Sequence, residues 1–367
     1  MKEYLIGVDA RPIESNPSGI GKLLIQTINA LLTYDDRIKF RLFSHLQVDT
    51  GHFVSPTRVH VVPVRCNKHL FDLFVPFYLR HYPLDIYYGA NQSVPLWGVK
   101  KRIVLICDMT PFVMPRLYSW KWHVYFKFWI SISVKLADQV IAISQHTKDD
   151  ISRILHANEN KISVVYPWYE PPSGSDARPK APSVLSALKV KKPFILFVGT
   201  LKKRKNIARL VEAFKSLVSE DKLDLELVLA GRLASGSEAV ELPRDADLFT
   251  RVHVLGYVNN GDLQTLYEKA EALAYPSLYE GFGIPLLEAM AHGLPIVTSN
   301  VGVMKEVVGD AGVLVDPYDA NSIAEGLRKV LTSEHLRNSM AESGYKRLVS
   351  FEKDHAIEAL HKILLER

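Results

Sequence analysis

The segment that most constrains the fold is residues 271–300, EALAYPSLYEGFGIPLLEAMAHGLPIVTSN. Residues 272–275 have the pattern of a short buried strand, which Pro276, Ser277 and a glycine-rich stretch interrupt. A helix follows, because Pro285 suits a first turn and Gly293 can adopt the left-handed conformation that ends a helix. Such strand, loop and helix units, repeated along a chain, predict a parallel sheet flanked by helices.

This segment carries two carboxylates. Glu280 follows the strand, and Glu288 lies on a helix with an apolar opposite face. The amides of the glycine-rich loop lie at the positive end of the helix dipole, where they can approach an anion. Amides suit phosphates and carboxylates suit sugar hydroxyls, so the arrangement favours a nucleotide-sugar. The alternative is a solvated loop residue at 280 and an ordinary surface position at 288.

Length and composition describe a globular protein of two domains. The chain has 367 residues, 47% hydrophobic and 23% charged, enough for two separate cores. Its two cysteines, Cys66 and Cys107, are too few for a disulfide framework, so we expect a reducing, cytoplasmic setting. The opening MKEYLIGVDARP has the pattern of a first strand rather than a signal peptide, and no apolar run has the length of a bilayer.

The string SLYEGFGIPLLEAMAHGLPIV resembles the Glu-x7-Glu signature of glycosyltransferase family 4, a group of retaining enzymes with the GT-B architecture. The resemblance covers nearly the whole chain and is strongest over 194–317. It implies an α/β fold of two Rossmann-like domains facing each other across a cleft. We expect an acceptor-binding domain over 1–170, a linker rich in Pro, Ser and Gly over 171–183, and a nucleotide-sugar domain over 184–349. A last helix, about 350–367, would pack back on the first domain.

Further strands alternate with helical stretches, and their carboxyl ends should carry the site. Residues 101–108, KRIVLICD, form one such strand and place Asp108 at its end. Relatives commonly have His-Asp here, whereas this chain has Cys107, so a catalytic role is predicted for Asp108 alone. Further strand candidates include 4–8, 39–44, 58–64, 86–88, 194–198, 225–229 and 252–255.

A run of four cations, 202–205, follows the strand 194–198. Such runs are usually solvated. The resemblance instead implies that Arg204 and Lys205 neutralise the leaving diphosphate, with Glu280 at the sugar and Glu288 at the ribose. It also implies further donor-binding positions: Phe282, Gly283, Ile284, Gly19, Gly231, Tyr257 and Val258. An Asp-x-Asp at 245–247 lies on the wrong side of a strand for a metal site, so we expect neither a metal nor another cofactor.

The net charge of +5 is concentrated in residues 1–170, which carry +6. Residues 115–136, PRLYSWKWHVYFKFWISISVKL, combine aromatics with lysines, and residues 69–82 have a similar character. Such segments are either core helices with snorkelling lysines or helices that lie on an anionic membrane surface. The second interpretation predicts peripheral contact with the inner face of the cell membrane. We expect no nucleic-acid partner.

The sequence therefore predicts a retaining hexosyltransferase that uses a nucleotide-diphosphate sugar and a saccharide or lipid-linked acceptor. The segments GFGIPLLEAM and GVDARP resemble those of bacterial mannosyl- and rhamnosyltransferases of surface polysaccharide assembly, including lipopolysaccharide. GDP-mannose is therefore the first donor that we expect. Retention could proceed by same-face attack, which we favour, or through a covalent intermediate. The alternatives are a GT-B epimerase or hydrolase and a non-catalytic sugar-nucleotide-binding subunit.

Overall fold

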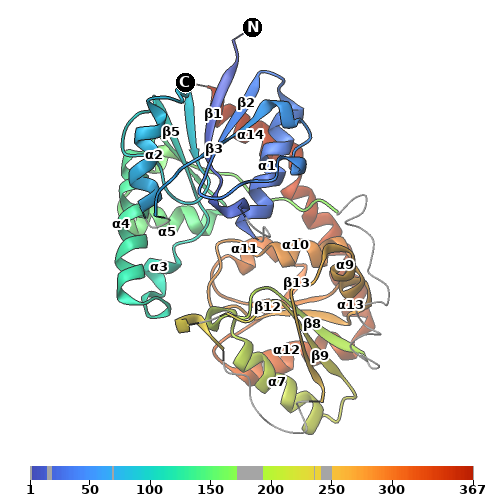
Figure 1. The fold of residues 1–367 in the computed structure, drawn as a ribbon. Helices are drawn as coiled ribbons and strands as arrows, with labels where there is room; N and C mark the ends of the chain where they lie inside the picture. The colour runs from blue at the N-terminus through green and yellow to red at the C-terminus, as the bar shows by residue number, and fades with distance from the viewer. Residues whose placement is uncertain are drawn as a thin grey trace. The chain divides into compact units, whose positions relative to one another are not determined.

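A computed structural model describes residues 2–14, 19–67, 70–171, 193–234, 236–240 and 250–366 (Figure 1). The contacts of the chain divide it into two compact units. Unit 1 comprises residues 1–115, 120–167 and 353–367, and unit 2 comprises residues 116–119 and 168–352. The expected linker 171–183 and the Asp-x-Asp at 245–247 lie outside the described residues, apart from residue 171.

Within its described residues, unit 1 is built on a seven-stranded parallel sheet in the order β3-β2-β1-β4-β5-β6-β7. Apolar runs such as the IGV of the first strand are buried, as expected where helices cover a parallel sheet. The strands are β1 (Tyr4–Asp9), β2 (Ile38–Ser44), β3 (Val59–Pro63), β4 (Ile86–Gly89), β5 (Lys101–Ile106), β6 (Gln139–Ala142) and β7 (Ile162–Val164).

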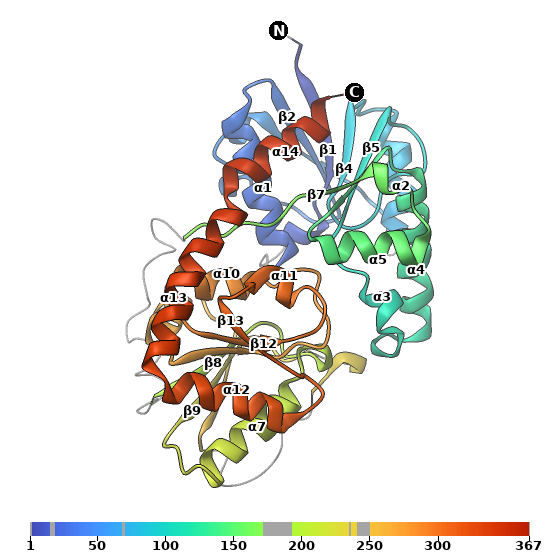
Figure 2. The same ribbon diagram turned by 180° about the vertical axis from the view of Figure 1, so that it is seen from behind.

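The described helices of unit 1 are α1 (Ile20–Tyr34), α2 (Phe71–Leu79), α3 (Thr110–Val113), α4 (Trp120–Leu136), α5 (Gln145–Leu155) and α14 (Lys353–Leu365). The last of them returns from the end of the chain to lie beside α1 (Figure 2). Its His361 Nε2 lies 2.8 Å from Asp35 Oδ2, and Lys101 Nζ donates to the carbonyl of Ile363 at 2.8 Å. The two ends of the chain thus share one core.

Unit 2 has a six-stranded parallel sheet among its described residues, in the order β10-β9-β8-β11-β12-β13. Phe197 and Tyr275 stack at its centre, with ring centroids 5.8 Å apart. The strands are β8 (Phe194–Val198), β9 (Glu226–Ala230), β10 (Val252–Gly256), β11 (Ala272–Tyr275), β12 (Ile296–Ser299) and β13 (Gly312–Val315). The helices are α7 (Ile207–Ser219), α9 (Asn260–Lys269), α10 (Ile284–Ala291), α11 (Met304–Val308), α12 (Ala320–Thr332) and α13 (Glu334–Leu348).

The predicted α/β class is confirmed, and most predicted strands lie within one or two residues of the observed ones. The prediction for 101–108 was too long, because β5 ends at Ile106 and Asp108 lies in the loop beyond it. The helical pattern from 320 onward is broken at Ser333 and again near Phe351 into three helices. Among the described residues, no helix combines the length and apolarity that crossing a membrane requires.

Candidate functional site

Two loops of unit 2 leave adjacent parallel strands at the same edge of the sheet. Strand β8 leads into the cationic turn Lys203–Lys205, and its neighbour β11 leads into the glycine-rich loop before α10. The carboxyl ends of parallel strands meet at one edge, which is where ligands of such sheets bind. The topology therefore brings together segments that are far apart in the sequence.

Arg204, Lys205 and Glu280 form an ion cluster at this edge. Arg204 Nη1 lies 2.6 Å from Glu280 Oε2, and Lys205 Nζ lies 2.5 Å from Glu280 Oε1. Only 16% of the Arg204 side chain, 9% of Lys205 and 7% of Glu280 is exposed. Lys205 also donates to the hydroxyl of Tyr275 and lies over its ring, 4.6 Å from the centroid.

Hydrogen bonds to main-chain carbonyls hold the two loops together. Asn206 has a left-handed backbone, with φ of 63°, and its buried side-chain amide nitrogen donates to the carbonyls of Pro276 at 3.0 Å and Pro317 at 2.6 Å. The Leu278 amide donates to the Arg204 carbonyl at 2.8 Å. Asparagine is among the few side chains that tolerate this conformation. The cations are therefore placed by a turn that is fixed on three sides.

The electrostatics of the cluster favour a second anion. Burial opposes ionisation of Glu280, but the charges of Arg204 and Lys205 outweigh it and lower its pKa to about 2. Burial lowers the pKa of Lys205 to about 8, although Glu280 opposes that shift. Near neutral pH two cations thus face one carboxylate, so the cluster carries a net charge of +1.

The amino end of α10 lies next in the same loop. Gly283 has φ of 108°, a conformation that favours glycine, and Ile284 is the first helical residue. The side chain of Phe282 is buried against Phe351, with centroids 5.5 Å apart, so only its main chain could meet a ligand. The backbone N–H groups of three predicted residues therefore lie at or just before a helix start.

Glu288 lies on α10 outside the ion cluster. Its Oε2 accepts a hydrogen bond from the Tyr267 hydroxyl at 2.6 Å. The ring of Tyr267 stacks on His292, with centroids 5.3 Å apart, and His292 Nδ1 lies 2.8 Å from the Glu288 carbonyl. The carboxylate is therefore held in a fixed direction while its side chain stays only partly buried.

The other predicted donor residues of unit 2 follow β9 and β10. A Cβ at Gly231 would lie 1.9 Å from the carbonyl oxygen of Gly199, so close backbone packing alone requires glycine there. Tyr257 is exposed and Val258 partly buried. Arg232 Cζ lies 5.1 Å from the Tyr257 ring centroid.

Two predicted residues, Gly19 and Asp108, belong to unit 1. Gly19 precedes α1 with φ of 52°, and a Cβ built on it would meet nothing within 4 Å. Asp108 Oδ1 accepts the Thr110 amide at 2.9 Å, which fixes its carboxylate beyond β5. Cys107 is buried, and its burial raises the pKa of the thiol.

Comparisons with known proteins identify the family. The family described as "Glycosyl transferases group 1" matches residues 185–347. The O-antigen chain mannosyltransferase B of Escherichia coli is 31% identical over 281 residues, covering 74% of this chain and 72% of that protein. The chain belongs to the group 1 glycosyl transferases.

Another relative of this glycosyltransferase is the N-acetylgalactosamine-N,N'-diacetylbacillosaminyl-diphospho-undecaprenol 4-alpha-N-acetylgalactosaminyltransferase of Campylobacter jejuni. It is 30% identical over 261 residues, 70% of this chain and 68% of that one. Among solved structures, the sucrose-phosphate synthase of Thermosynechococcus elongatus has a TM-score of 0.78 at 17% identity, covering 99% and 98% of the two chains. The lipopolysaccharide glycosyltransferase WaaG has a TM-score of 0.75 at 18% identity, covering 99% and 100%. The fold is GT-B, as predicted.

Several residues of this glycosyltransferase were missed by the sequence analysis. Tyr275 reads as an apolar strand residue, and nothing local marks its hydroxyl as a partner of Lys205. Asn206 could have been found, since an asparagine before a helix often adopts a special backbone. In unit 1, no site role was predicted for Asp9 or Arg11, although the Asp9 side chain is fully buried and that of Arg11 is only 16% exposed.

Proposed function

We propose that this glycosyltransferase moves a hexose from a nucleoside-diphosphate sugar to a hydroxyl of a saccharide, with retention of configuration. The observation that carries the proposal is the buried cluster of Arg204, Lys205 and Glu280, whose net charge of +1 a diphosphate would offset. Unit 2 would bind the donor and unit 1 the acceptor.

In this proposal the leaving diphosphate is stabilised by Arg204, Lys205 and the amides of residues 282–284. Negative charge grows on the diphosphate as the bond from the sugar C1 to phosphate oxygen breaks. Preorganised cations and amides placed where charge develops are usually the largest catalytic contribution. They also supply the positive charge that a divalent metal would otherwise bring, so we propose that turnover requires no added metal.

Two carboxylates would orient the donor. Glu288, directed by Tyr267, would accept hydrogen bonds from the ribose hydroxyls. Glu280 would contact a sugar hydroxyl, since each carboxylate oxygen has a second lone pair beyond the one used for a cation. Gly231, Tyr257 and Val258 would border the base. Gly19, in unit 1, remains a donor position implied by the family resemblance.

Retention is assigned to same-face attack. The acceptor hydroxyl forms the new bond to C1 on the face from which the diphosphate departs, and its proton passes to a leaving phosphate oxygen. Asp108 is the candidate nucleophile of the covalent alternative, and its carboxylate already accepts the Thr110 amide. The same-face route needs no protein nucleophile.

Mannose is the proposed sugar and GDP the proposed nucleotide. The support comes from the names of relatives, which include O-antigen chain mannosyltransferases of Escherichia coli and Salmonella typhimurium. One structural neighbour, Anabaena HepE, was solved with UDP and glucose, so UDP-glucose is the competing donor. The acceptor would be a growing, lipid-linked surface saccharide.

A lipid-linked acceptor implies contact with the inner face of the membrane, and α4 is suited to it. Trp120, Val124 and Phe128 are exposed at a spacing of four residues, which places them on one face of the helix. Lys121 and Lys127 flank them, and the helix contains no acidic residue. Such a face combines apolar insertion with attraction to anionic lipid.

A thermal-shift panel of GDP-mannose, UDP-glucose and dTDP-rhamnose, followed by transfer to an alkyl mannoside, tests the proposal. GDP-mannose should raise the melting temperature most, and Lys205→Ala should abolish the shift. A product anomer with retained configuration is expected in the presence of EDTA. Sugar release without an acceptor would instead indicate a hydrolase, an altered sugar nucleotide an epimerase, and binding without turnover a non-catalytic subunit.

A further inference from the structure

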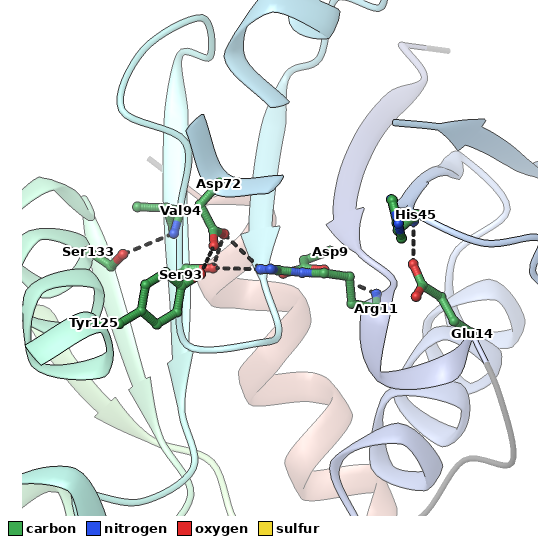
Figure 3. A network of polar contacts seen from close by, with 9 residues as sticks. All are labelled: Asp9, Arg11, Glu14, His45, Asp72, Ser93, Val94, Tyr125 and Ser133. Carbon is green, nitrogen blue, oxygen red and sulfur yellow. Dashed lines mark hydrogen bonds and ion pairs between the residues drawn. The ribbon is translucent and has the colours of Figure 1, made fainter. Parts of the chain in front are cut away.

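A second ion cluster lies at the carboxyl end of β1 in unit 1. Asp9 is fully buried and Arg11 is 16% exposed. Arg11 Nε lies 3.0 Å from Asp9 Oδ1, and Nη2 lies 2.6 Å from Oδ2, so the carboxylate grips one edge of the guanidinium (Figure 3). This edge of the sheet is where a parallel α/β domain binds its ligand.

Other segments hold the same guanidinium from the opposite side. Asp72, on α2, lies with Oδ1 2.7 Å from Arg11 Nη2. The Asp72 carboxylate also accepts the Ser93 hydroxyl at 2.6 Å and the Tyr125 hydroxyl of α4 at 3.0 Å, as Figure 3 shows. The Arg11 Cζ lies 4.2 Å from the ring centroid of Phe71. Arg11 is therefore immobilised by three parts of unit 1.

One nitrogen of this fixed cation has no acceptor among the residues that the structure describes. Within the described residues, Nη1 of Arg11 makes no hydrogen bond or ion pair, whereas Nε and Nη2 make all of those observed. A guanidinium carries two N–H groups on that nitrogen. A partly exposed, rigid donor of this kind binds a ligand oxygen with little loss of side-chain entropy.

Unit 1 contains a second Asp-x-Arg clamp, in which a carboxylate binds the guanidinium two residues later as Asp9 binds Arg11. Arg37 Nε lies 3.0 Å from Asp35 Oδ1, and its Nη2 lies 2.7 Å from Oδ2, almost the geometry of Asp9 and Arg11. This second clamp precedes β2, at the amino edge of the sheet, and its arginine is 39% exposed. The pattern Asp-x-Arg thus builds a structural pair at either edge, and only the Arg11 clamp lies where ligands bind.

We propose that Arg11 donates from Nη1 to a hydroxyl of a neutral sugar in the acceptor, which deepens and rests on the proposed function. Asp9 and Asp72 give the cluster a net charge of −1, which repels a phosphate or carboxylate and leaves an uncharged hydroxyl as the suitable acceptor of the bond. The cluster of Arg204, Lys205 and Glu280 has the opposite charge. The two units thus divide the ligands by charge, with the diphosphate in unit 2 and the neutral saccharide in unit 1.

The test is saturation-transfer NMR of full-length protein, with GDP in excess and a panel of methyl glycosides: mannoside, rhamnoside, glucoside, N-acetylglucosaminide and glucuronide. A neutral glycoside should bind the wild type, and Arg11→Lys should bind it at least about ten-fold more weakly. Arg37→Lys, the matched control, should bind as the wild type does. Equal binding by Arg11→Lys, equal loss in Arg37→Lys, preference for the glucuronide, or no binding to the wild type would overturn the proposal.

Two further measurements separate this inference from neighbouring questions. A crystal soaked with the same neutral glycoside needs no variant and should show a hydroxyl oxygen within about 3.2 Å of Arg11 Nη1. A glycoside bound elsewhere contradicts the proposal. The thermal shift with GDP-mannose reports only on the donor, so it should be kept in Arg11→Lys. If GDP-mannose does not raise the melting temperature of the wild type, the proposed function is contradicted instead.

Discussion

Lys205 Nζ lies 2.5 Å from Glu280 Oε1, and less than a tenth of either side chain is exposed. The two residues follow β8 and β11, so the pair forms only when these neighbouring strands are aligned. A buried pair of this kind can contribute to the fold, and under the proposed function it would also contribute to donor binding. Its two roles can be separated, because they respond differently to pH and to substitution.

The affinity for GDP should fall above about pH 8. Burial lowers the pKa of Lys205 to about 8 from its ordinary 10.5, so the ammonium is lost in a range where free lysine stays charged. If the diphosphate binds the protonated form, affinity falls by up to about ten-fold per pH unit beyond that point. Titration calorimetry between about pH 7.5 and 9.5 measures this. In Lys205→Arg, the guanidinium stays charged, and affinity should be flat.

Titration of Lys205 does not lower affinity by unfolding the protein. The unfolded chain holds the Lys205 proton up to its ordinary pKa of 10.5, whereas the folded chain releases it near 8. Between these values the unfolded state binds more protons, so this residue makes folding more favourable as pH rises. A wild-type affinity that stays constant to about pH 9.5 would contradict the assignment of Lys205 to the diphosphate.

Replacing Glu280 with glutamine should destabilise the protein by about 3–5 kcal/mol, because two buried cations lose their carboxylate. Glu238→Gln is the matched control. Its partner Lys202 lies 2.8 Å away, but both side chains are more exposed, so the loss should be under about 1 kcal/mol. Urea denaturation monitored by tryptophan fluorescence gives both values. Equal losses would show that the buried cluster has no special role in stability.

Protonation of the same carboxylate should lower the stability of the fold at acid pH. The cations hold the pKa of Glu280 at about 2 against an ordinary value of 4.5, despite burial. Its stabilisation is therefore complete above pH 4.5 and disappears as pH falls toward 2. The stability difference between wild type and Glu280→Gln should shrink over that interval. A difference that stays constant from neutral pH down to pH 3 would argue that Glu280 acts through shape rather than charge.

The cluster of Arg204, Lys205 and Glu280 could be predicted from sequence because its parts have local signals. The strand before Arg204, the glycine loop after Glu280 and the start of α10 are all marked by apolar runs, Gly and Pro. The family resemblance supplied the pairing of these parts. Local pattern alone could not, since contact between the two loops depends on β8 lying beside β11.

The Arg11 cluster shows what such patterns leave out. Asp35-Asp36-Arg37 has the same spacing as Asp9-Ala10-Arg11, and both segments form the same clamp. What distinguishes them is the edge of the sheet at which each lies and the approach of Asp72 and Tyr125 from distant helices. Those facts belong to the tertiary structure, so no short motif could have separated a binding arginine from a structural one.

Glu288→Ala should remove the contribution of the ribose hydroxyls to GDP affinity. We expect the wild type to prefer GDP over 2′,3′-dideoxy-GDP by about ten-fold, the usual effect of losing hydrogen bonds to a charged group. In Glu288→Ala that preference should vanish, because the nucleotide and protein changes remove the same interaction. Competition against a fluorescent GDP analogue measures all four affinities. A preference that survives the substitution would place the ribose elsewhere.

The exposed face of α4 should bind anionic vesicles. Trp120→Ser with Phe128→Ser removes two of the three apolar residues on this face. Tyr318→Ser with Tyr345→Ser, the matched control, changes two aromatics of unit 2 that are also more than half exposed. Cosedimentation with phosphatidylglycerol vesicles should fall at least about ten-fold for the first pair and stay unchanged for the second. Lys121→Gln with Lys127→Gln should reduce binding to anionic but not to neutral vesicles, since each lysine near the surface contributes about 1 kcal/mol. Equal binding by wild type and the α4 pair would return this helix to the alternative that the sequence left open, a core helix with lysines at its rim.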